Sequence, residues 1–127
     1  MRLFIVRHAE AAPGDPDELR RLTPVGRTTA RALGERLAAH APDAIIASPL
    51  LRARETADLI AKACGLEAEP DDRLAPGVTE ESLRAAVAGH GDTVVAVFHQ
   101  PDCSELVLAV TGRDRAFAPG AVDEIAL

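Results

Sequence analysis

Two histidines and two arginines stand close to strongly apolar stretches of the sequence. Arg7 and His8 directly follow a short apolar run, and His99 directly follows the longest one. Arg52 comes shortly after a third run. A guanidinium group binds oxyanions through paired N–H donors, and a neutral imidazole serves as a nucleophile or a base. These residue types therefore indicate chemistry on an anion, if the chain brings them together.

Three buried strands are predicted to position these side chains. Runs 3–6, 44–47 and 93–98 are apolar without polar alternation, which is typical of strands buried on both faces of an α/β sheet. Ligands of open α/β sheets bind outside the carboxyl ends of the strands. If the three strands are parallel neighbours, His8 and His99 converge with the two arginines at one rim. The alternative is that these charged residues are only solvated strand ends.

Helical patterns between the strands indicate two further layers. Thr23-Pro24 opens a helix predicted over 24–40, with Thr as the N-cap and Pro at the first helical position. Ser48-Pro49 repeats this arrangement for a second helix. Shorter helices are predicted after Thr79 and from Asp102 onward. We therefore expect a three-layer α/β/α sandwich with a mostly parallel central sheet.

The composition fits one soluble globular domain over residues 1–127. Hydrophobic residues make up 47% of the chain, and no apolar run has the length of a membrane span or the pattern of a signal peptide. We therefore expect a cytoplasmic protein. The net charge of -6 argues against nucleic-acid and membrane partners, because both present negative charge.

Arg52 and Arg54 add a second indication of an anion site. Both fall in or near the first turn of the second predicted helix, where the helix dipole and the free N–H groups already present positive charge. A cation there is unfavourable by up to ~1 kcal/mol unless an anion lies against it. A bound phosphate would reverse the sign of this effect.

Metal binding is the competing use of two histidines. Only Glu10 or Asp102 could complete a ligand shell, and two adjacent arginines would repel a divalent cation. We therefore expect neither a metal nor another cofactor. The cysteines indicate no other chemistry: Cys64 falls on the core stripe of its helix. Cys103 lies at a helix start but has no partner arginine, so we interpret it as a packing residue.

Four stretches of the chain occur in an order and spacing that are more specific than any one of them. They are LFIVRHAE at 3–10, RRLTPVG at 20–26, SPLLRARETA at 48–57 and HQPD at 99–102. Together they resemble the histidine phosphatase (phosphoglycerate mutase-like) superfamily, and in particular its short bacterial SixA-like phosphohistidine phosphatases. The resemblance extends from Arg2 almost to the end of the chain.

The resemblance implies a phosphoglycerate mutase-like fold and a metal-independent phosphatase. It assigns His8 as the nucleophile, which forms a phosphohistidine intermediate. Arg7, Arg52 and His99 would bind the phosphoryl group and stabilise the charge that develops during transfer. The two arginine charges favour the neutral imidazole that His8 needs for attack. Water then hydrolyses the intermediate.

One departure from the family concerns the proton donor. Mutase-like branches carry a glutamate in the loop after the second helix, whereas the matching region here, 74–77, has no carboxylate. An alkoxide leaving group needs a proton, but the imidazole released from phosphohistidine is a far better leaving group. The sequence therefore favours phosphohistidine on a protein as the substrate. Glu81 and Asp102 are the candidates for a substitute acid.

A second departure is at the carboxyl end, where relatives usually continue beyond the last predicted strand, 121–127. The chain is either a naturally short member or one truncated before its C-terminal hairpin. An open edge strand there is a candidate homodimer contact.

Two other functions stay open from the sequence. A small-molecule phosphomonoesterase of the same superfamily would act on a small phosphorylated substrate. A non-catalytic module would bind a phosphorylated ligand without turnover. Intact His8 favours an enzyme, because a binding module has no need of a nucleophile.

Overall fold

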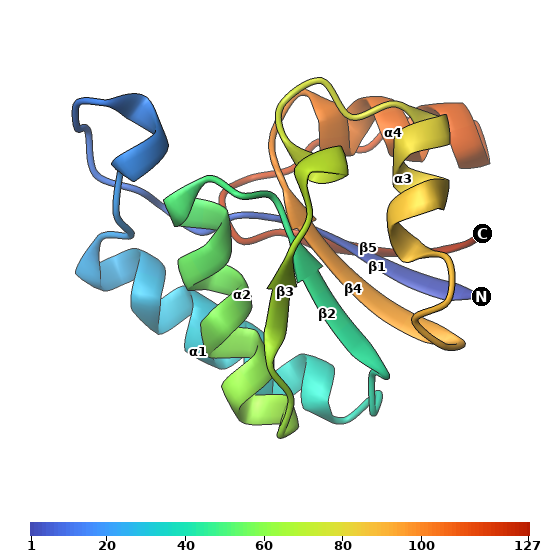
Figure 1. Ribbon diagram of the computed structural model, residues 1–127, viewed down its shortest axis with the longest axis horizontal. Coiled ribbons are helices and arrows are strands. Elements are labelled where there is room, and N and C mark those ends of the chain that lie inside the picture. The colour runs from blue at the N-terminus through green and yellow to red at the C-terminus, as the bar shows by residue number, and fades with distance from the viewer.

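One five-stranded sheet runs through the computed structural model, which describes residues 1–127 (Figure 1). The order across the sheet is β3-β2-β4-β1-β5, and only β5 runs antiparallel to its neighbour. The strands are β1 (Arg2–Arg7), β2 (Ala44–Ala47), β3 (Ala68–Pro70), β4 (Thr93–Phe98) and β5 (Val122–Ala126). The mostly parallel sheet predicted from the sequence is therefore confirmed.

Four α-helices cover the two faces of this sheet (Figure 1). Side chains of α1 and α2 form one core layer with the sheet, and side chains of α3 and α4 form the other. The helices are α1 (Pro24–Ala38), α2 (Leu51–Cys64), α3 (Glu80–Val87) and α4 (Asp102–Thr111), with short 3-10 turns η1 (Asp17–Leu19) and η2 (Asp72–Leu74). This is the predicted three-layer α/β/α sandwich. None of the helices has both the length and the apolar character needed to cross a bilayer.

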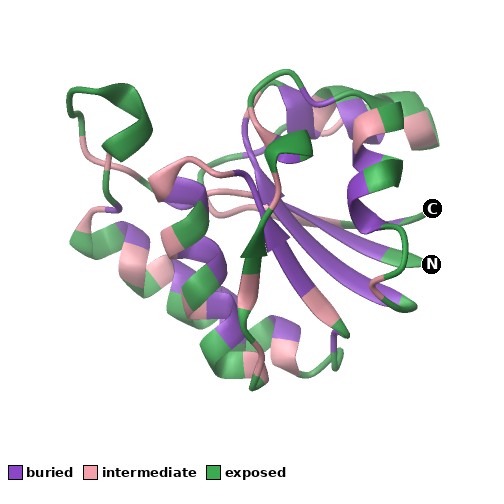
Figure 2. Cartoon of the chain, in the orientation of Figure 1, coloured by how far each residue is buried: buried purple, intermediate pink, exposed green.

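The alternation of side chains along β1 and β4 builds both core layers. Leu3 and Ile5 belong to the layer beneath α3 and α4, whereas Phe4 and Val6 belong to the layer beneath α1 and α2. Every residue of β4 is buried (Figure 2). The carboxyl ends of these two strands are therefore held by packing from both sides.

Two helix boundaries differ from the sequence prediction. α1 ends at Ala38 instead of residue 40, and α2 begins at Leu51 instead of residue 49. The N-cap of α2 is Leu50, not Ser48. The Ser48 hydroxyl accepts from the Leu50 amide at 3.3 Å and also lies 2.7 Å from His99 Nε2, so it serves a tertiary contact besides the local one.

The two chain ends lie side by side at the amino end of β1 (Figure 1). The Leu127 amide donates to the Met1 carbonyl at 3.0 Å, and the Met1 amino group donates to the Leu127 carbonyl at 3.4 Å. β5 forms one edge of the sheet, as the sequence predicted for the last strand.

Candidate active site

The register of the strands brings the two histidines together. β1 and β4 pair with Arg7 opposite Phe98, so the next residue of each segment is a histidine. The His8 amide donates to the Phe98 carbonyl at 3.1 Å, and the ring centroids of His8 and His99 are 5.3 Å apart. β2 lies on the other side of β4, and a 2.9 Å hydrogen bond from the Ser48 amide to β4 brings this serine to the same rim.

Both predicted arginines lie at this rim as well. Arg52 is buried in the first turn of α2, and Arg7 Nη1 donates to the Phe117 carbonyl at 2.9 Å. The positive charges of the two arginines lower the pKa of both His8 and His99, as charges do when they are close. The structure therefore places the four side chains that the sequence singled out at one edge of the sheet.

Three buried nitrogen atoms at the rim have no hydrogen-bond partner within the protein. They are Nε of Arg7, Nε of Arg52 and Nδ1 of His99. Leaving a buried polar atom unpaired costs on the order of 1–3 kcal/mol, and nearly all such atoms in proteins are paired. Three of them in one place indicate a site for a ligand with several acceptor atoms. A phosphoryl group is a ligand of this kind.

One nitrogen of His8 is free to react. His8 Nδ1 lies 2.8 Å from the Ala9 carbonyl oxygen, which can only accept, so we assign the proton of the neutral ring to Nδ1. Nε2 then carries a lone pair. The pKa of His8 is lowered to about 4, mainly by burial, with smaller contributions from Arg52 and Arg7. The sequence predicted that the two arginines keep the His8 ring neutral, but burial lowers its pKa more than they do.

His99 is held by a serine from the neighbouring strand. Its Nε2 lies 2.7 Å from Ser48 Oγ, and both residues are buried. The serine hydroxyl has no other acceptor, so we assign its proton to this bond and the proton of the neutral ring to Nδ1. The pKa of His99 is lowered to about 3, mainly by burial, with smaller contributions from the neighbouring His8 and Arg52. His99 therefore offers Nδ1 as a neutral donor.

Two residues of α2, Thr56 and Glu55, join this helix to other segments near the rim. The sequence assigned neither of them an individual role. Thr56 Oγ1 donates to the Arg52 carbonyl at 2.8 Å and accepts from the Ala9 amide at 3.1 Å, which ties α2 to the segment after β1. The Glu55 carboxylate accepts from the Leu22 amide at 2.8 Å. Their partners are distant in the sequence, so the only available signal was their place in the stretch 48–57.

The start of α1 is docked against the segment after β1. Thr23 Oγ1 donates to the Glu10 carboxylate at 2.9 Å and accepts from the Gly26 amide at 2.9 Å. A Cβ on Gly26 would lie 2.1 Å from the Glu10 carbonyl oxygen, so this approach requires glycine. The Glu10 carboxylate, considered above as a metal ligand, is used in this contact. No group of three or more His, Cys, Asp or Glu side chains is arranged to hold a metal ion.

The loop after β3 is anchored beside the rim by Asp102. This carboxylate is buried and accepts from the amides of Gly77 and Val78 at 2.9 and 3.1 Å. The sequence predicted a helix from Asp102 onward, and α4 begins there with Pro101 as its N-cap, while the Asp102 carboxylate bonds to the loop. Glu81, the other candidate acid, lies exposed in the first turn of α3.

Both cysteines lie where the sequence predicted. Cys103 is fully buried in the core layer beneath α3 and α4, and burial raises the pKa of its thiol. Cys64, at the end of α2, packs half-buried against the other core layer, and burial raises its pKa too. Neither thiol is poised as a nucleophile.

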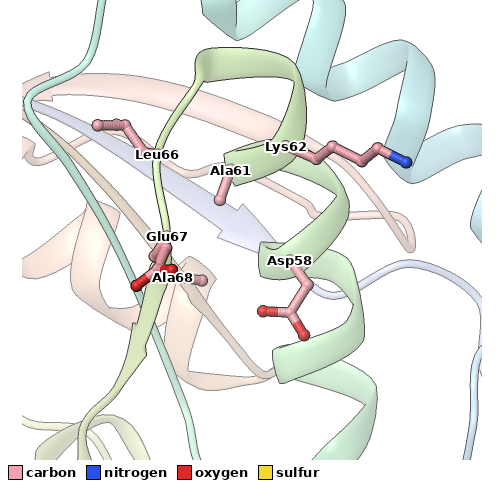
Figure 3. A pocket seen from close by; sticks show the side chains of 6 residues that line it. All are labelled: Asp58, Ala61, Lys62, Leu66, Glu67 and Ala68. Atoms are coloured by element: carbon pink, nitrogen blue, oxygen red, sulfur yellow. The ribbon is translucent and has the colours of Figure 1, made fainter.

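A separate hollow of about 440 Å³ lies between the C-terminal half of α2 and the chain leading into β3 (Figure 3). It contains none of the four rim residues. Asp58 and Glu67 contribute carboxylates to its wall, while the Lys62 side chain extends away from them toward α1. Two carboxylates repel a phosphoryl dianion, so the hollow offers no second phosphate site.

These features define a class of protein: a three-layer α/β protein with two neutral histidines and two arginines gathered at the carboxyl edge of its parallel strands. The sequence profile of the histidine phosphatase superfamily (branch 1) matches residues 3–77, more than half of the chain. The chain belongs to this superfamily, and the assignment supports a phosphatase, which acts on phosphorylated substrates.

Comparison with solved structures gives the same fold. The protein histidine phosphatase SixA complexed with tungstate superposes with a TM-score of 0.87 at 27% identity, covering 100% of this chain and 88% of that one. A protein assigned as phosphohistidine phosphatase SixA from Agrobacterium tumefaciens gives 0.82 at 24% identity, covering 99% and 97%. Another, from Nakamurella multipartitia, gives 0.72 at 30% identity, covering 83% and 62%. The phosphoglycerate mutase-like fold is thereby confirmed. No curated protein sequence matches the chain.

Proposed function

We propose that the protein is a metal-independent phosphatase that hydrolyses phosphohistidine on another protein. The observation that carries this proposal is the free Nε2 of His8 beside the unpaired nitrogens of Arg7, Arg52 and His99. A nucleophile with its lone pair exposed lies next to donors that have no partner in the protein. This is the arrangement that phosphoryl transfer requires.

The proposed reaction has two displacements at phosphorus. In the first, the Nε2 lone pair of His8 attacks phosphorus, and the bond from phosphorus to the substrate imidazole breaks. That imidazole keeps the electron pair and takes a proton from solvent. In the second, a water oxygen attacks phosphorus, the bond to Nε2 breaks, and phosphate leaves. The two guanidinium groups and His99 stabilise the equatorial oxygens in both steps.

The absence of a free carboxylate from the loop at 74–77 favours an N–P bond over an alkyl ester as the bond that is cleaved. The Asp102 carboxylate is occupied by two backbone amides, and the loop it anchors carries no carboxylate at 74–77. An alkoxide would leave without help, whereas an imidazole needs little. The relative bound to tungstate, a tetrahedral oxyanion, is named a protein histidine phosphatase, which adds support for this substrate class.

Three substrates test the proposal directly. We expect rapid turnover of a phosphohistidine peptide and of para-nitrophenyl phosphate, whose phenolate leaves without a donor. Turnover of glycerol 2-phosphate should be slower by about 10²-fold or more, the usual contribution of a general acid. Equal rates on all three would instead favour the small-molecule phosphomonoesterase. Tight phosphopeptide binding without release of phosphate would favour the non-catalytic module.

Metal independence is tested separately with a chelator. Two fixed guanidinium charges stand where a divalent cation would otherwise neutralise the phosphoryl oxygens. Dialysis against EDTA should therefore leave kcat unchanged. Loss of activity that magnesium or zinc restores would contradict this part of the proposal.

A further inference from the structure

Every hydrogen bond that the Arg52 side chain makes is to one residue, Asp17 in η1. Nη1 donates to the Asp17 carbonyl at 3.0 Å, and Nη2 donates to its carboxylate at 3.2 Å. The other oxygen of this carboxylate accepts from Arg20 Nη1 at 3.3 Å. An internal anion thus bridges a guanidinium of the proposed phosphate site and a second arginine whose charge lowers the pKa of His8.

The carboxylate neutralises a charge that a phosphoryl group would also use. Arg52 has five N–H donors, of which Asp17 engages one on Nη1 and one on Nη2, while Nε is unpaired. The two anions therefore do not need the same protons, but they lie against the same guanidinium charge and repel each other. A phosphoryl ligand and the Asp17 carboxylate compete for Arg52 in this electrostatic sense.

The two partners differ in how firmly they are held. The Arg52 side chain is 9% exposed, whereas the Asp17 side chain is 60% exposed. η1 contains no buried residue, and it stands beside the N-terminal end of α2, away from the sheet (Figures 1 and 2). An exposed carboxylate exchanges its partner for water at little cost. Asp17 is the partner that leaves, and Arg52 stays in place.

We propose that Asp17 is an internal competitor for Arg52 that sets the affinity for phosphoryl groups. A ligand with two negative charges displaces the single charge of this carboxylate, while a monoanion such as a free carboxylate gains nothing by the exchange. Asp17 thereby acts as a specificity-determining residue, which holds the anion site closed to singly charged groups. The inference rests on the proposed function, since it takes Arg52 as part of the phosphoryl site.

Binding of inorganic phosphate by calorimetry at pH 7.5 tests the inference without turnover. In Asp17→Asn the competing charge is lost, so the dissociation constant for phosphate should fall about tenfold. This corresponds to a wild-type protein in which Arg52 is free of Asp17 in about one molecule in ten, and a variant in which it is free in nearly all. Asp15→Asn is the matched control: it removes a charge from the same exposed segment and should leave the constant within about twofold of wild type. Acetate should bind measurably to Asp17→Asn only.

Kinetics give an independent readout. Asp17→Asn should lower KM for a phosphohistidine peptide with kcat within about twofold of wild type, because the charge acts on binding and not on the bonds that break. Weaker phosphate binding or a raised KM in Asp17→Asn would mean that Asp17 holds Arg52 in position, and it would overturn the inference. An unchanged dissociation constant would overturn it as well.

The outcomes separate this inference from the proposed function. Tighter phosphate binding in Asp17→Asn without hydrolysis of any phosphorylated substrate would support the competitor and refute the phosphatase. Normal hydrolysis with no response to Asp17→Asn would refute the competitor alone. In Arg52→Ala the effect of Asp17→Asn should vanish, since the two residues would no longer be coupled. Persistence of the effect in that background would assign it to another arginine and overturn the inference.

Discussion

The amino and carboxyl ends of the central strands differ in how fully their charged groups are paired. At the amino end, the Asp43 carboxylate accepts from the amides of Asp92 and Thr93 at 3.0 Å each, and Arg2 pairs with Glu124 at 2.8 Å. At the carboxyl end, three buried nitrogens of two arginines and a histidine have no partner in the protein. The charged groups named at the amino end are paired within the protein, whereas the carboxyl end keeps three buried donors free beside the paired Asp17 and Asp102.

This difference separates structural from functional use of charge. Paired groups at the amino end contribute to stability and need no ligand. Unpaired buried donors at the carboxyl end reduce stability, and such strain persists in native structures where a ligand is bound or a reaction is carried out. Substitutions at the carboxyl end should therefore lower activity, whereas substitutions at the amino end should lower the free energy of unfolding.

The largest effect is expected for His8→Ala. Removing the nucleophile abolishes the first displacement, so kcat for a phosphohistidine peptide should fall by more than about 10³-fold. His40→Ala, which removes the imidazole near Arg2 at the amino end, is the control and should keep kcat within about threefold. The measurement is release of phosphate. A His8→Ala enzyme with wild-type turnover would refute the intermediate.

Arg52→Ala should come next. It removes a donor from the developing charge on the phosphoryl oxygens, at a cost of about 3–4 kcal/mol in kcat/KM, or roughly 10²–10³-fold. Arg54→Ala, one step further along the same helix and exposed, is the matched control, with an expected change below about twofold. A loss smaller than about tenfold in Arg52→Ala would count against the assigned role.

Stability should depend on pH through half-buried His8 and buried His99. The pKa of His8 is lowered to about 4 and that of His99 to about 3, whereas both take up a proton near 6.5 in the unfolded chain. The unfolded state then binds more protons below 6.5, so stability is full above that pH and falls as the pH drops toward 4. Urea unfolding at pH 5 should show a loss of roughly 1–2 kcal/mol per histidine relative to pH 7.5. In His8→Ala the loss should be smaller.

At the amino end, Asp43→Ala should act on stability alone. It leaves two backbone amides without their acceptor, at a cost of about 1–2 kcal/mol in the free energy of unfolding. Activity of the folded variant should equal that of wild type. Because Arg52 is paired only with the exposed Asp17 and keeps its buried Nε unpaired, the unfolding free energy of Arg52→Ala should change less than that of Asp43→Ala. A reversed order in urea unfolding would contradict the contrast between the two ends.

The smallest effect is expected for Ser48→Ala, which removes the hydrogen bond that orients His99. A loss of about 1 kcal/mol, or roughly fivefold in kcat/KM, is typical of one such bond. Ser48→Thr keeps the hydroxyl and should restore activity, which distinguishes orientation of the ring from simple packing. Failure of Ser48→Thr to exceed Ser48→Ala would argue against the orienting role.

The sequence predicted the strands and the convergence of the rim because both follow from local patterns. Continuous apolar runs such as 93–98 are buried on both faces, and residues that follow parallel strands share an edge. The sequence alone therefore predicts that His8 and His99 lie together. The start and core side of α2 followed in the same way, to within two residues at its first turn.

Contacts between distant segments were not predictable from the sequence. The pairing of Asp17 with Arg52 depends on how an irregular segment folds back over α2, which no periodicity encodes. The contact of Ser48 with His99 and that of Asp102 with the loop at 77–78 join different elements, so neither could be read from local sequence. The dominance of burial over arginine charge in the pKa of His8 required knowledge of the folded environment.

The adjacency of Met1 and Leu127 has a practical consequence for handling the molecule. A short peptide linker across these two residues would give a cyclic backbone, and chains of this kind tolerate new termini in exposed turns. Both ends sit at the start of β1, about 20 Å of extended strand from His8. Immobilisation on a solid support through either residue would therefore leave the edge that carries His8 and His99 facing solution.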